Sequence, residues 1–324
     1  MSGNGKFIIS LDTELAWGTV DKPESRERNS KYYYKTRDVI EHILNLFAVN
    51  DITATWAVIG HLFLAECREE NGIKHPEIKR SEYDHYDRDW FAQDPATNIE
   101  QDPTWYGRDI IEKIKACPVK QEIASHSFAH ILYGHPFTKK ETVRSDLIRF
   151  EETAEEWGVE SKSFVFPRNM VGHLPEIERA GFKAFRGSEP SWYEGVNKYF
   201  KKVCHMFDQF FALTPPVVEP QLEAGLVNIP ASMLYLSMDS FRKYIPISAR
   251  IKKAKKGINA AIQENKIFHL WFHPFNIATA PDKLISGLEK IISYADKKRG
   301  TGKLEIKTIG EVAEQFLGKY KNGR

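Results

Sequence analysis

Residues 123–130 read Ile-Ala-Ser-His-Ser-Phe-Ala-His, in which a short apolar run is followed by two histidines four positions apart. The run has the length and composition of a buried parallel strand. In α/β barrels and open α/β sheets, ligands and catalytic groups gather at the carboxyl ends of such strands. We therefore interpret His126 and His130 as part of a site at a strand end.

Polar residues follow three other apolar runs in the same way. Because parallel strands end at one edge of a sheet, we expect these endings to form one site together with the two histidines. The endings are Asp12-Thr13-Glu14 after residues 7–11, Pro167-Arg168-Asn169 after residues 164–166, and His273-Pro274 after residues 267–272.

Strand-like and helix-like segments alternate along the chain, which is typical of an α/β protein with a parallel sheet. No linker or internal repeat divides the sequence, so residues 1–324 are interpreted as a single domain. The apolar spacing predicts strands at 7–11, 53–58, 122–124, 163–166, 183–186, 267–272 and 304–307, with helices at 37–50, 109–117, 139–157, 174–180, 239–265, 282–298 and 308–317.

Two segments interrupt the alternation. Residues 71–106 and 189–235 are rich in aromatic side chains and in turn-forming prolines, and both exceed the usual length of a loop. We interpret them as insertions that cover the carboxyl-terminal face of the sheet and contribute to a substrate cap.

The composition argues against several classes of protein. The net charge of +2 indicates neither a nucleic-acid-binding protein nor one that binds a charged membrane surface. Three separated cysteines indicate neither a disulfide framework nor a thiolate zinc site. No stretch has the length or character of a signal peptide or of a membrane span, so we expect a cytoplasmic protein. The oligomeric state is left open, a homo-oligomer included.

Histidines four residues apart on one helical turn point the same way, so His126 and His130 could bind one metal ion. A hydrolytic zinc-like site commonly has three protein ligands and one open position. A carboxylate is the natural third ligand, and either Asp12 or Glu14 could supply it. Residues 12 and 14 lie on the same side of an extended segment, so both carboxylates can face the site.

Taken in order, Asp12-Thr13-Glu14, His126-Ser127-Phe128-Ala129-His130, Pro167-Arg168 and Leu270-Trp271-Phe272-His273 resemble the motifs of the polysaccharide deacetylases (NodB-homology domain, carbohydrate esterase family 4). The resemblance spans residues 6–317. It implies a distorted (β/α) barrel of about seven parallel strands. It also implies a divalent metal ion, most simply zinc, with cobalt, nickel or manganese as alternatives, and the removal of acetyl groups from N-acetylated sugars.

The resemblance also implies a role for each matching residue. Asp12 would be the general base and Glu14, His126 and His130 the metal ligands. Arg168 would hold and orient the base, and His273 would be the general acid. The first motif departs from the commonest form, which has two adjacent aspartates, so the division of roles between Asp12 and Glu14 stays open.

Three further residues are interpreted from their strands. On the strand at 267–272, His269, Trp271 and His273 share one face. His269 lies deeper and is interpreted as a core histidine, whereas Trp271 would contact substrate and orient His273. Arg186, which ends the strand at 183–186, could also reach the substrate.

The leading hypothesis is therefore a metal-dependent hydrolase that removes an acetyl group from an N-acetylated sugar, such as a cytoplasmic precursor of a surface polysaccharide. One alternative keeps the fold and the metal but cleaves a small cyclic amide or ureide. A second alternative is a catalytically silent carbohydrate-binding protein.

Overall fold

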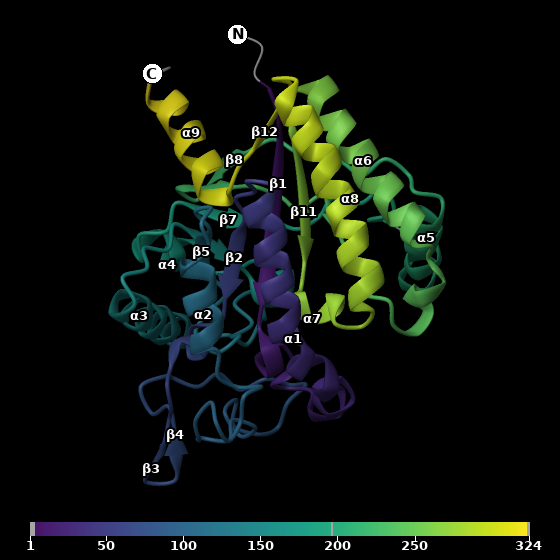
Figure 1. The fold of residues 1–324 in the computed structure, drawn as a ribbon. Coiled ribbons are helices and arrows are strands. Elements are labelled where there is room, and N and C mark those ends of the chain that lie inside the picture. The colour runs from purple at the N-terminus through teal and green to yellow at the C-terminus, as the bar shows by residue number, and fades with distance from the viewer. Residues whose placement is uncertain (1–3, 196, 323–324) are drawn as a thin grey trace.

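A curled, mostly parallel β-sheet forms the centre of the molecule, and helices pack around its outer face (Figure 1). The structure is a computed structural model that describes residues 4–195 and 197–322. Across the sheet the strands lie in the order β10 (Met233–Leu234), β11 (Ile267–Phe272), β1 (Gly5–Thr13), β2 (Thr55–Val58), β5 (Glu122–Ser125), β6 (Ser163–Val165), β7 (Ala184–Arg186), β9 (Leu226–Asn228) and β8 (Gln221–Glu223), and β12 (Leu304–Ile306) pairs with β1.

The predicted α/β class is confirmed, since the sheet curls into a half-barrel. All neighbouring strands in the described part of this sheet pair in parallel except β8 and β9. Within the described residues the sheet has ten strands, more than the sequence predicts. The excess arises because segment 189–235 carries β8, β9 and β10, and is therefore partly scaffold instead of an insertion throughout.

Most helices fall where the apolar spacing predicts them, but the first one begins fourteen residues earlier, at Pro23 instead of Arg37. Residues 24–32 are half-buried or exposed, so they carry no apolar periodicity that would reveal a helix. The α-helices are α1 (Pro23–Val49), α2 (Arg108–Lys115), α3 (Lys140–Glu156), α4 (Leu174–Arg179), α5 (Lys198–Phe210), α6 (Ile247–Glu264), α7 (Pro274–Ile277), α8 (Pro281–Gly300) and α9 (Ile309–Asn322), and the 3₁₀ turns are η1 (Leu15–Thr19), η2 (Gly60–Phe63), η3 (Pro167–Asn169) and η4 (Ser240–Tyr244).

The two faces of β1 have different chemistry. Phe7, Ile9 and Leu11 point outward and pack in the main core against the helices. Ile8 points inward and belongs to a smaller core on the concave side of the sheet. Period-two alternation therefore turns Ser10 and Asp12 toward the concave side as well, which places a carboxylate inside the half-barrel at the end of the strand.

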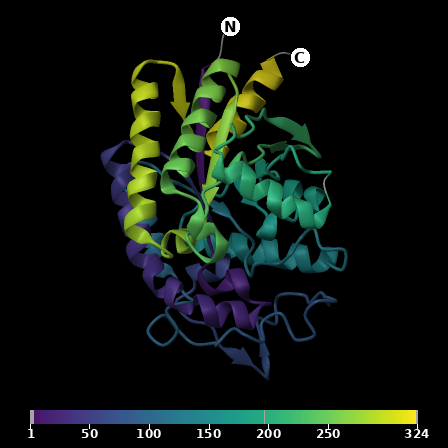
Figure 2. The ribbon, with the colours of Figure 1, turned by 90° about the vertical axis from the view of Figure 1, so that its right-hand side faces the viewer.

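Helix α9 fills the amino-terminal end of the half-barrel. Its first residues, Ile309 and Gly310, donate backbone N–H groups to the Thr55 hydroxyl and to the Glu122 carboxylate at 2.9 and 3.0 Å. Both chain ends lie on this side of the molecule (Figures 1 and 2). The polar residues that follow β1, β5 and β11 lie at the opposite end of the half-barrel, where these strands finish.

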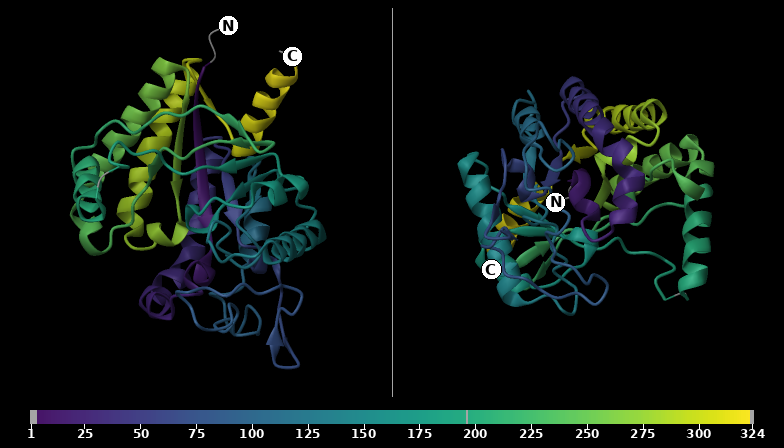
Figure 3. Two further views of the ribbon diagram at one scale, coloured as in Figure 1. Left: turned by 180° about the vertical axis from the view of Figure 1, so that it is seen from behind. Right: turned by 90° about the horizontal axis from the view of Figure 1, so that it is seen from below.

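The two aromatic segments differ in structure. Residues 71–106 contain mostly turns and lie beyond the carboxyl ends of the sheet's strands (Figure 3). They include β4 (Ile73–Lys74), which forms a short hairpin with β3 (Glu69–Glu70). Segment 189–235 contains α5, which packs beside α6 (Figure 2). Among the described residues, no helix combines the length and apolar character that a bilayer crossing requires.

Candidate metal and catalytic site

Asp12 and Glu14 lie at the end of β1 and are 2% and 5% exposed. Asp12 is within the strand, whereas Glu14 lies just beyond it and precedes η1. Their carboxylates nevertheless reach the same neighbour. The His273 Nε2 atom is 3.8 Å from Asp12 Oδ2 and 3.4 Å from Glu14 Oε1. The expectation that both carboxylates face one site is confirmed.

His126 and His130 converge on the carboxylate of Glu14. Glu14 Oε1 lies 2.9 Å from His126 Nε2 and 3.4 Å from His130 Nε2. The two imidazole rings are 5.4 Å apart between centroids, and both are buried. The three side chains that the sequence predicts as ligands are therefore adjacent.

The histidines are not on a helical turn, so this part of the sequence prediction is wrong. The loop after β5 is irregular, with positive φ at Ser127 (69°) and at His130 (57°). The Ser127 hydroxyl accepts the N–H of Ile131 at 2.9 Å. This side-chain bond closes the turn that brings the two imidazoles together.

A buried aspartate on α3 holds the same loop. Asp146 accepts the N–H groups of Phe128 and Ala129 at 2.9 and 3.1 Å and the hydroxyl of Tyr133 at 2.8 Å. Burial raises the pKa of the Asp146 carboxyl, although these donors oppose the rise. Asp146 thus satisfies two backbone donors that the irregular loop would otherwise bury unpaired.

The donor set of Glu14, His126 and His130 fits a divalent cation. The Nδ1 atom of His126 lies 2.7 Å from the carbonyl oxygen of Val165, so a proton held there would leave the Nε2 lone pair free for a cation bound beside Glu14. Two imidazoles and one carboxylate form a common hydrolytic zinc set with an open position. Burial acts to raise the pKa of Glu14, but His273, His126 and His130 outweigh it and hold that pKa well below its usual range.

Asp12 is held by Arg186. The guanidinium donates to Oδ1 at 2.5 Å and to Oδ2 at 2.7 Å, and also to the Ser10 hydroxyl and to the side-chain oxygen of Asn169. Burial raises the pKa of Asp12, but the Arg186 charge more than offsets it, so the pKa lies below its ordinary value. Arg186 also lies over the ring of Trp271, 4.4 Å from its centroid.

Arg168 does not contact Asp12, so the expectation that it orients the base is corrected. Its guanidinium pairs with the buried carboxylate of Asp21, which also lies 2.9 Å from His85 Nε2. Arg168 lies in η3, after β6 has ended, and has a φ of 54°. Its side chain therefore does not follow the alternation of the strand toward Asp12. Arg186, by contrast, is the last residue of β7 and shares the inward face with Ala184.

His273 follows β11 and lies at the opening of the site, with 19% of its side chain exposed. Burial disfavours its charged form, but the carboxylates of Glu14 and Asp12 outweigh burial and raise the pKa of His273. Its ring packs between Trp271 and Phe275, at 5.6 and 5.1 Å between centroids. Trp271 therefore packs beside the predicted acid, as expected.

His269 lies deeper on the same strand and is completely buried. Its Nε2 atom is 2.8 Å from the Ser10 hydroxyl, and burial lowers its pKa to about 3. The interpretation as a core histidine is confirmed. Glu189, which the sequence analysis passed over, accepts the indole N–H of Trp271 at 3.2 Å, and burial raises its pKa to about 7.

Comparisons with known proteins relate this arrangement to one fold. No protein-family model and no curated protein sequence matches the chain. Two solved structures described as polysaccharide deacetylases do match it. The structure from Mycobacterium smegmatis has a TM-score of 0.65 at 15% identity, and the match covers 99% of this chain and 92% of the Mycobacterium smegmatis chain. The structure from Pseudomonas aeruginosa PAO1 has a TM-score of 0.57 at 13% identity, over 97% and 91% of the two chains.

A third solved structure shows that this fold carries more than one chemistry. The 4-alpha-glucanotransferase from Thermococcus litoralis matches with a TM-score of 0.54 at 12% identity. The match covers 96% of this chain and 40% of the glucanotransferase chain. The chain therefore has a polysaccharide-deacetylase-like fold. Because one fold can hold unrelated activities, its activity must be argued from the site.

Proposed function

We propose that the protein is a hydrolase that uses a divalent metal ion to remove the acetyl group of an N-acetylated sugar. The observation that carries the proposal is the convergence of His126 and His130 on the Glu14 carboxylate, with Asp12 and His273 beside it. The likeness of fold to structures described as polysaccharide deacetylases supports the same chemistry.

Glu14, His126 and His130 would hold the cation. When bound, a cation there supplies Lewis-acid polarisation of the acetamide carbonyl and lowers the pKa of a water at the site. The carboxylate of Glu14 contacts the imidazole of His273 at 3.4 Å. His273 has 19% of its side chain exposed, so a substrate would reach it past this exposed edge.

Asp12 would accept the proton of the attacking water as the new C–O bond forms. Arg186 fixes the plane of that carboxylate through two hydrogen bonds, so it is a positioning residue. The same guanidinium lowers the basicity of Asp12, which is the cost of holding it in one orientation. General bases act efficiently only within hydrogen-bond reach of the proton they take, which makes the orientation decisive.

His273 would protonate the departing nitrogen as the C–N bond breaks. The carboxylates of Glu14 and Asp12 raise the pKa of His273, which favours the protonated imidazole that a general acid requires. The products are acetate and a sugar with a free amine. Trp271, whose ring packs beside that of His273, would contact the sugar.

The test is acetate release from a panel of N-acetylated sugars, free, nucleotide-linked and oligomeric, by zinc-loaded protein. The cytoplasmic precursor expected from sequence is one member of that panel. Acetate release that Asp12→Asn abolishes would support the proposal. Release of ammonia or a new carboxylate from cyclic amides without acetate would point instead to the ureide hydrolase. Glycan binding that survives His126→Ala, with no turnover, would indicate a binding protein.

A further inference from the structure

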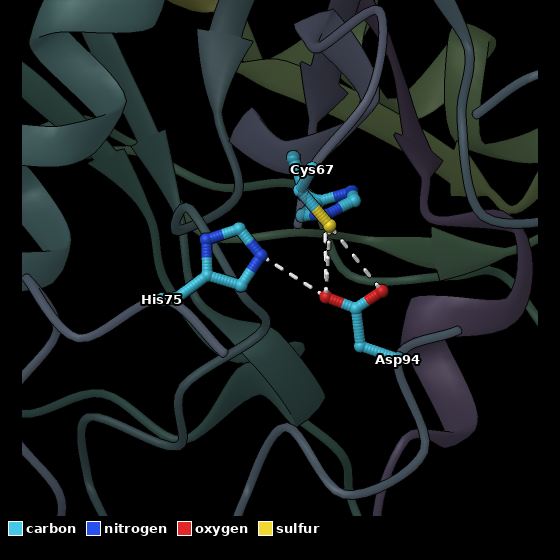
Figure 4. Close-up of side chains that lie close together, drawn as sticks. Cys67, His75 and Asp94 are labelled. Carbon is cyan, nitrogen blue, oxygen red and sulfur yellow. Dashed lines mark hydrogen bonds and ion pairs between the residues drawn. The ribbon is translucent and has the colours of Figure 1, made fainter. Parts of the chain in front are cut away.

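A second cluster of metal-ligating side chains lies outside the proposed catalytic site. His61, Cys67, His75 and Asp94 each offer one ligand atom, and these four atoms lie within 4.8 Å of one another. Figure 4 shows the Cys67 sulfur and the His75 ring directed at the carboxylate of Asp94. His61, His75 and Asp94 are at most 4% exposed. The cluster therefore combines two buried imidazoles and one buried carboxylate with the half-buried thiol of Cys67.

The distances fit a tetrahedral zinc site. Asp94 Oδ2 lies 3.4 Å from Cys67 Sγ, 3.0 Å from His75 Nε2 and 3.5 Å from His61 Nε2. Zinc bonds of about 2.0–2.3 Å in a tetrahedron place ligand atoms roughly 3.3–3.8 Å apart. Only small adjustments would let all four atoms contact one ion.

The second nitrogen of each imidazole also faces an acceptor. His61 Nδ1 is 3.3 Å from the carbonyl oxygen of Trp105, and His75 Nδ1 is 3.2 Å from the Glu77 carboxylate. Histidines that ligate a metal almost always donate their other N–H in this way, which directs the free lone pair at the ion. The remaining nitrogen of His61, Nε2, is buried and has no hydrogen-bond partner among the described residues.

A cluster without metal would leave these groups poorly matched. His75 has a carboxylate oxygen beside each ring nitrogen, at 3.0 Å from Asp94 and 3.2 Å from Glu77. A neutral His61 that donates from Nδ1 to the Trp105 carbonyl turns the lone pair of its buried Nε2 toward the Asp94 carboxylate, 3.5 Å away, and leaves that nitrogen without a donor. A buried polar atom without a partner is costly. A divalent ion bound to one thiolate, one carboxylate and two neutral imidazoles gives a net charge of zero.

We propose that His61, Cys67, His75 and Asp94 bind a structural zinc ion. Four protein ligands leave no open position, which is the arrangement of structural sites rather than catalytic ones. The aromatic rings of Trp17, Phe91 and Tyr106 pack against the two imidazoles at 4.5–5.1 Å and shield the site from water. Zinc suits this mixture of nitrogen, sulfur and oxygen donors.

The ion would connect the turn-rich segment to the sheet. His61 belongs to η2 directly after β2, whereas the other three ligands lie in residues 67–94, a region with little regular structure. The same ion would also support the loop of the catalytic histidines. The Phe128 ring of that loop packs against the rings of His61 and His75. The backbone N–H of His61 also donates to the backbone carbonyl of Phe128 at 2.9 Å.

The cysteine spacing does not indicate this zinc site, because only one of its ligands is a cysteine. A single thiolate also makes the site easy to distinguish from the catalytic one. Glu14, His126 and His130 provide only nitrogen and oxygen ligands. Of the two clusters, the second alone offers a sulfur ligand among the described residues, so zinc–sulfur bonding distinguishes it from the catalytic site whatever the outcome of the proposed deacetylase activity.

The experiment uses the full chain, expressed with zinc and dialysed into metal-free buffer. X-ray absorption at the zinc edge should show sulfur at about 2.3 Å from zinc. Elemental analysis should show that His126→Ala/His130→Ala retains one zinc per chain. Adding Cys67→Ser to that variant should remove the zinc, whereas adding Cys117→Ser should not, because Cys117 lies outside the cluster.

Zinc bound without sulfur, no retained zinc, or zinc that remains after Cys67→Ser would each overturn the proposal. If Cys67→Ser yields no folded protein, the absorption spectrum of the unmodified chain decides alone, since it requires no substitution.

Discussion

Arg186 donates two hydrogen bonds to the carboxylate of Asp12, at 2.5 and 2.7 Å, across the inner face of the half-barrel. Both side chains are nearly inaccessible to solvent. The pair connects the end of β7 to the end of β1, so the fold itself determines the orientation of the proposed base.

Replacing Arg186 by lysine should reduce kcat roughly 10²-fold and leave KM nearly unchanged, because a point charge cannot hold the carboxylate plane through two parallel bonds. Steady-state kinetics on the best acetylated substrate measures this split. Arg168→Lys is the matched control and should leave kcat within a few-fold, since Arg168 pairs with Asp21. A larger loss in the control than in Arg186→Lys would contradict the assignment.

Removing a ligand and removing the acid should have different signatures. Glu14→Ala should lower both bound zinc at the catalytic site and turnover, because the site loses its carboxylate ligand. His273→Ala should retain the zinc and lose about 10²–10⁴-fold in kcat, the usual contribution of a general acid. Elemental analysis beside kinetics separates the two. Equal zinc loss in both variants would show that His273 is a ligand instead.

Asp146 should stabilise the histidine loop without touching substrate. Asp146→Ala leaves the N–H groups of Phe128 and Ala129 buried without an acceptor, at about 1–3 kcal/mol each. Tyr133→Phe is the matched control, since it removes a single donor and leaves both backbone bonds intact. Urea denaturation should therefore show a clearly larger loss of stability for Asp146→Ala. Equal losses would argue that the carboxylate does not organise the loop.

Glu189 should make the protein less stable as the pH rises. Its pKa is about 7 in the folded protein against an ordinary 4.5, so between these values the folded state binds more protons than the unfolded chain. Stability attributable to Glu189 therefore falls from pH 4.5 to about 7 and is constant above, by at most about 3 kcal/mol.

Glu189→Gln removes this dependence and keeps an acceptor for the Trp271 indole. The difference in unfolding free energy, variant minus parent, should rise across that pH range in urea titrations. A difference that does not change with pH would contradict the burial of a protonated Glu189.

The strand endings could be predicted from sequence because each apolar run is a continuous stretch of sequence and the polar residues follow it directly. The choice between two arginines could not be made in that way. Arg168 and Arg186 both follow apolar residues, but only Arg186 continues the alternation of a strand, and that periodicity is the signal that would have identified it.

Long-range packing determines the features that sequence did not reveal. The loop of His126 and His130 adopts positive φ angles because Ser127 and Asp146 satisfy its backbone, and Asp146 lies on another element. The zinc ligands proposed above, His61 to Asp94, have no compact spacing. They meet only after a turn-rich segment folds back onto η2.

The central claim is that one cation binds between Glu14, His126 and His130. Anomalous diffraction at the zinc edge from crystals grown with zinc tests it most directly. We predict a peak about 2.0–2.2 Å from Glu14 Oε1 and from the Nε2 atoms of both histidines. Density that lacks such a peak, or a peak that persists at the same position in His130→Ala crystals with full occupancy, would contradict the account.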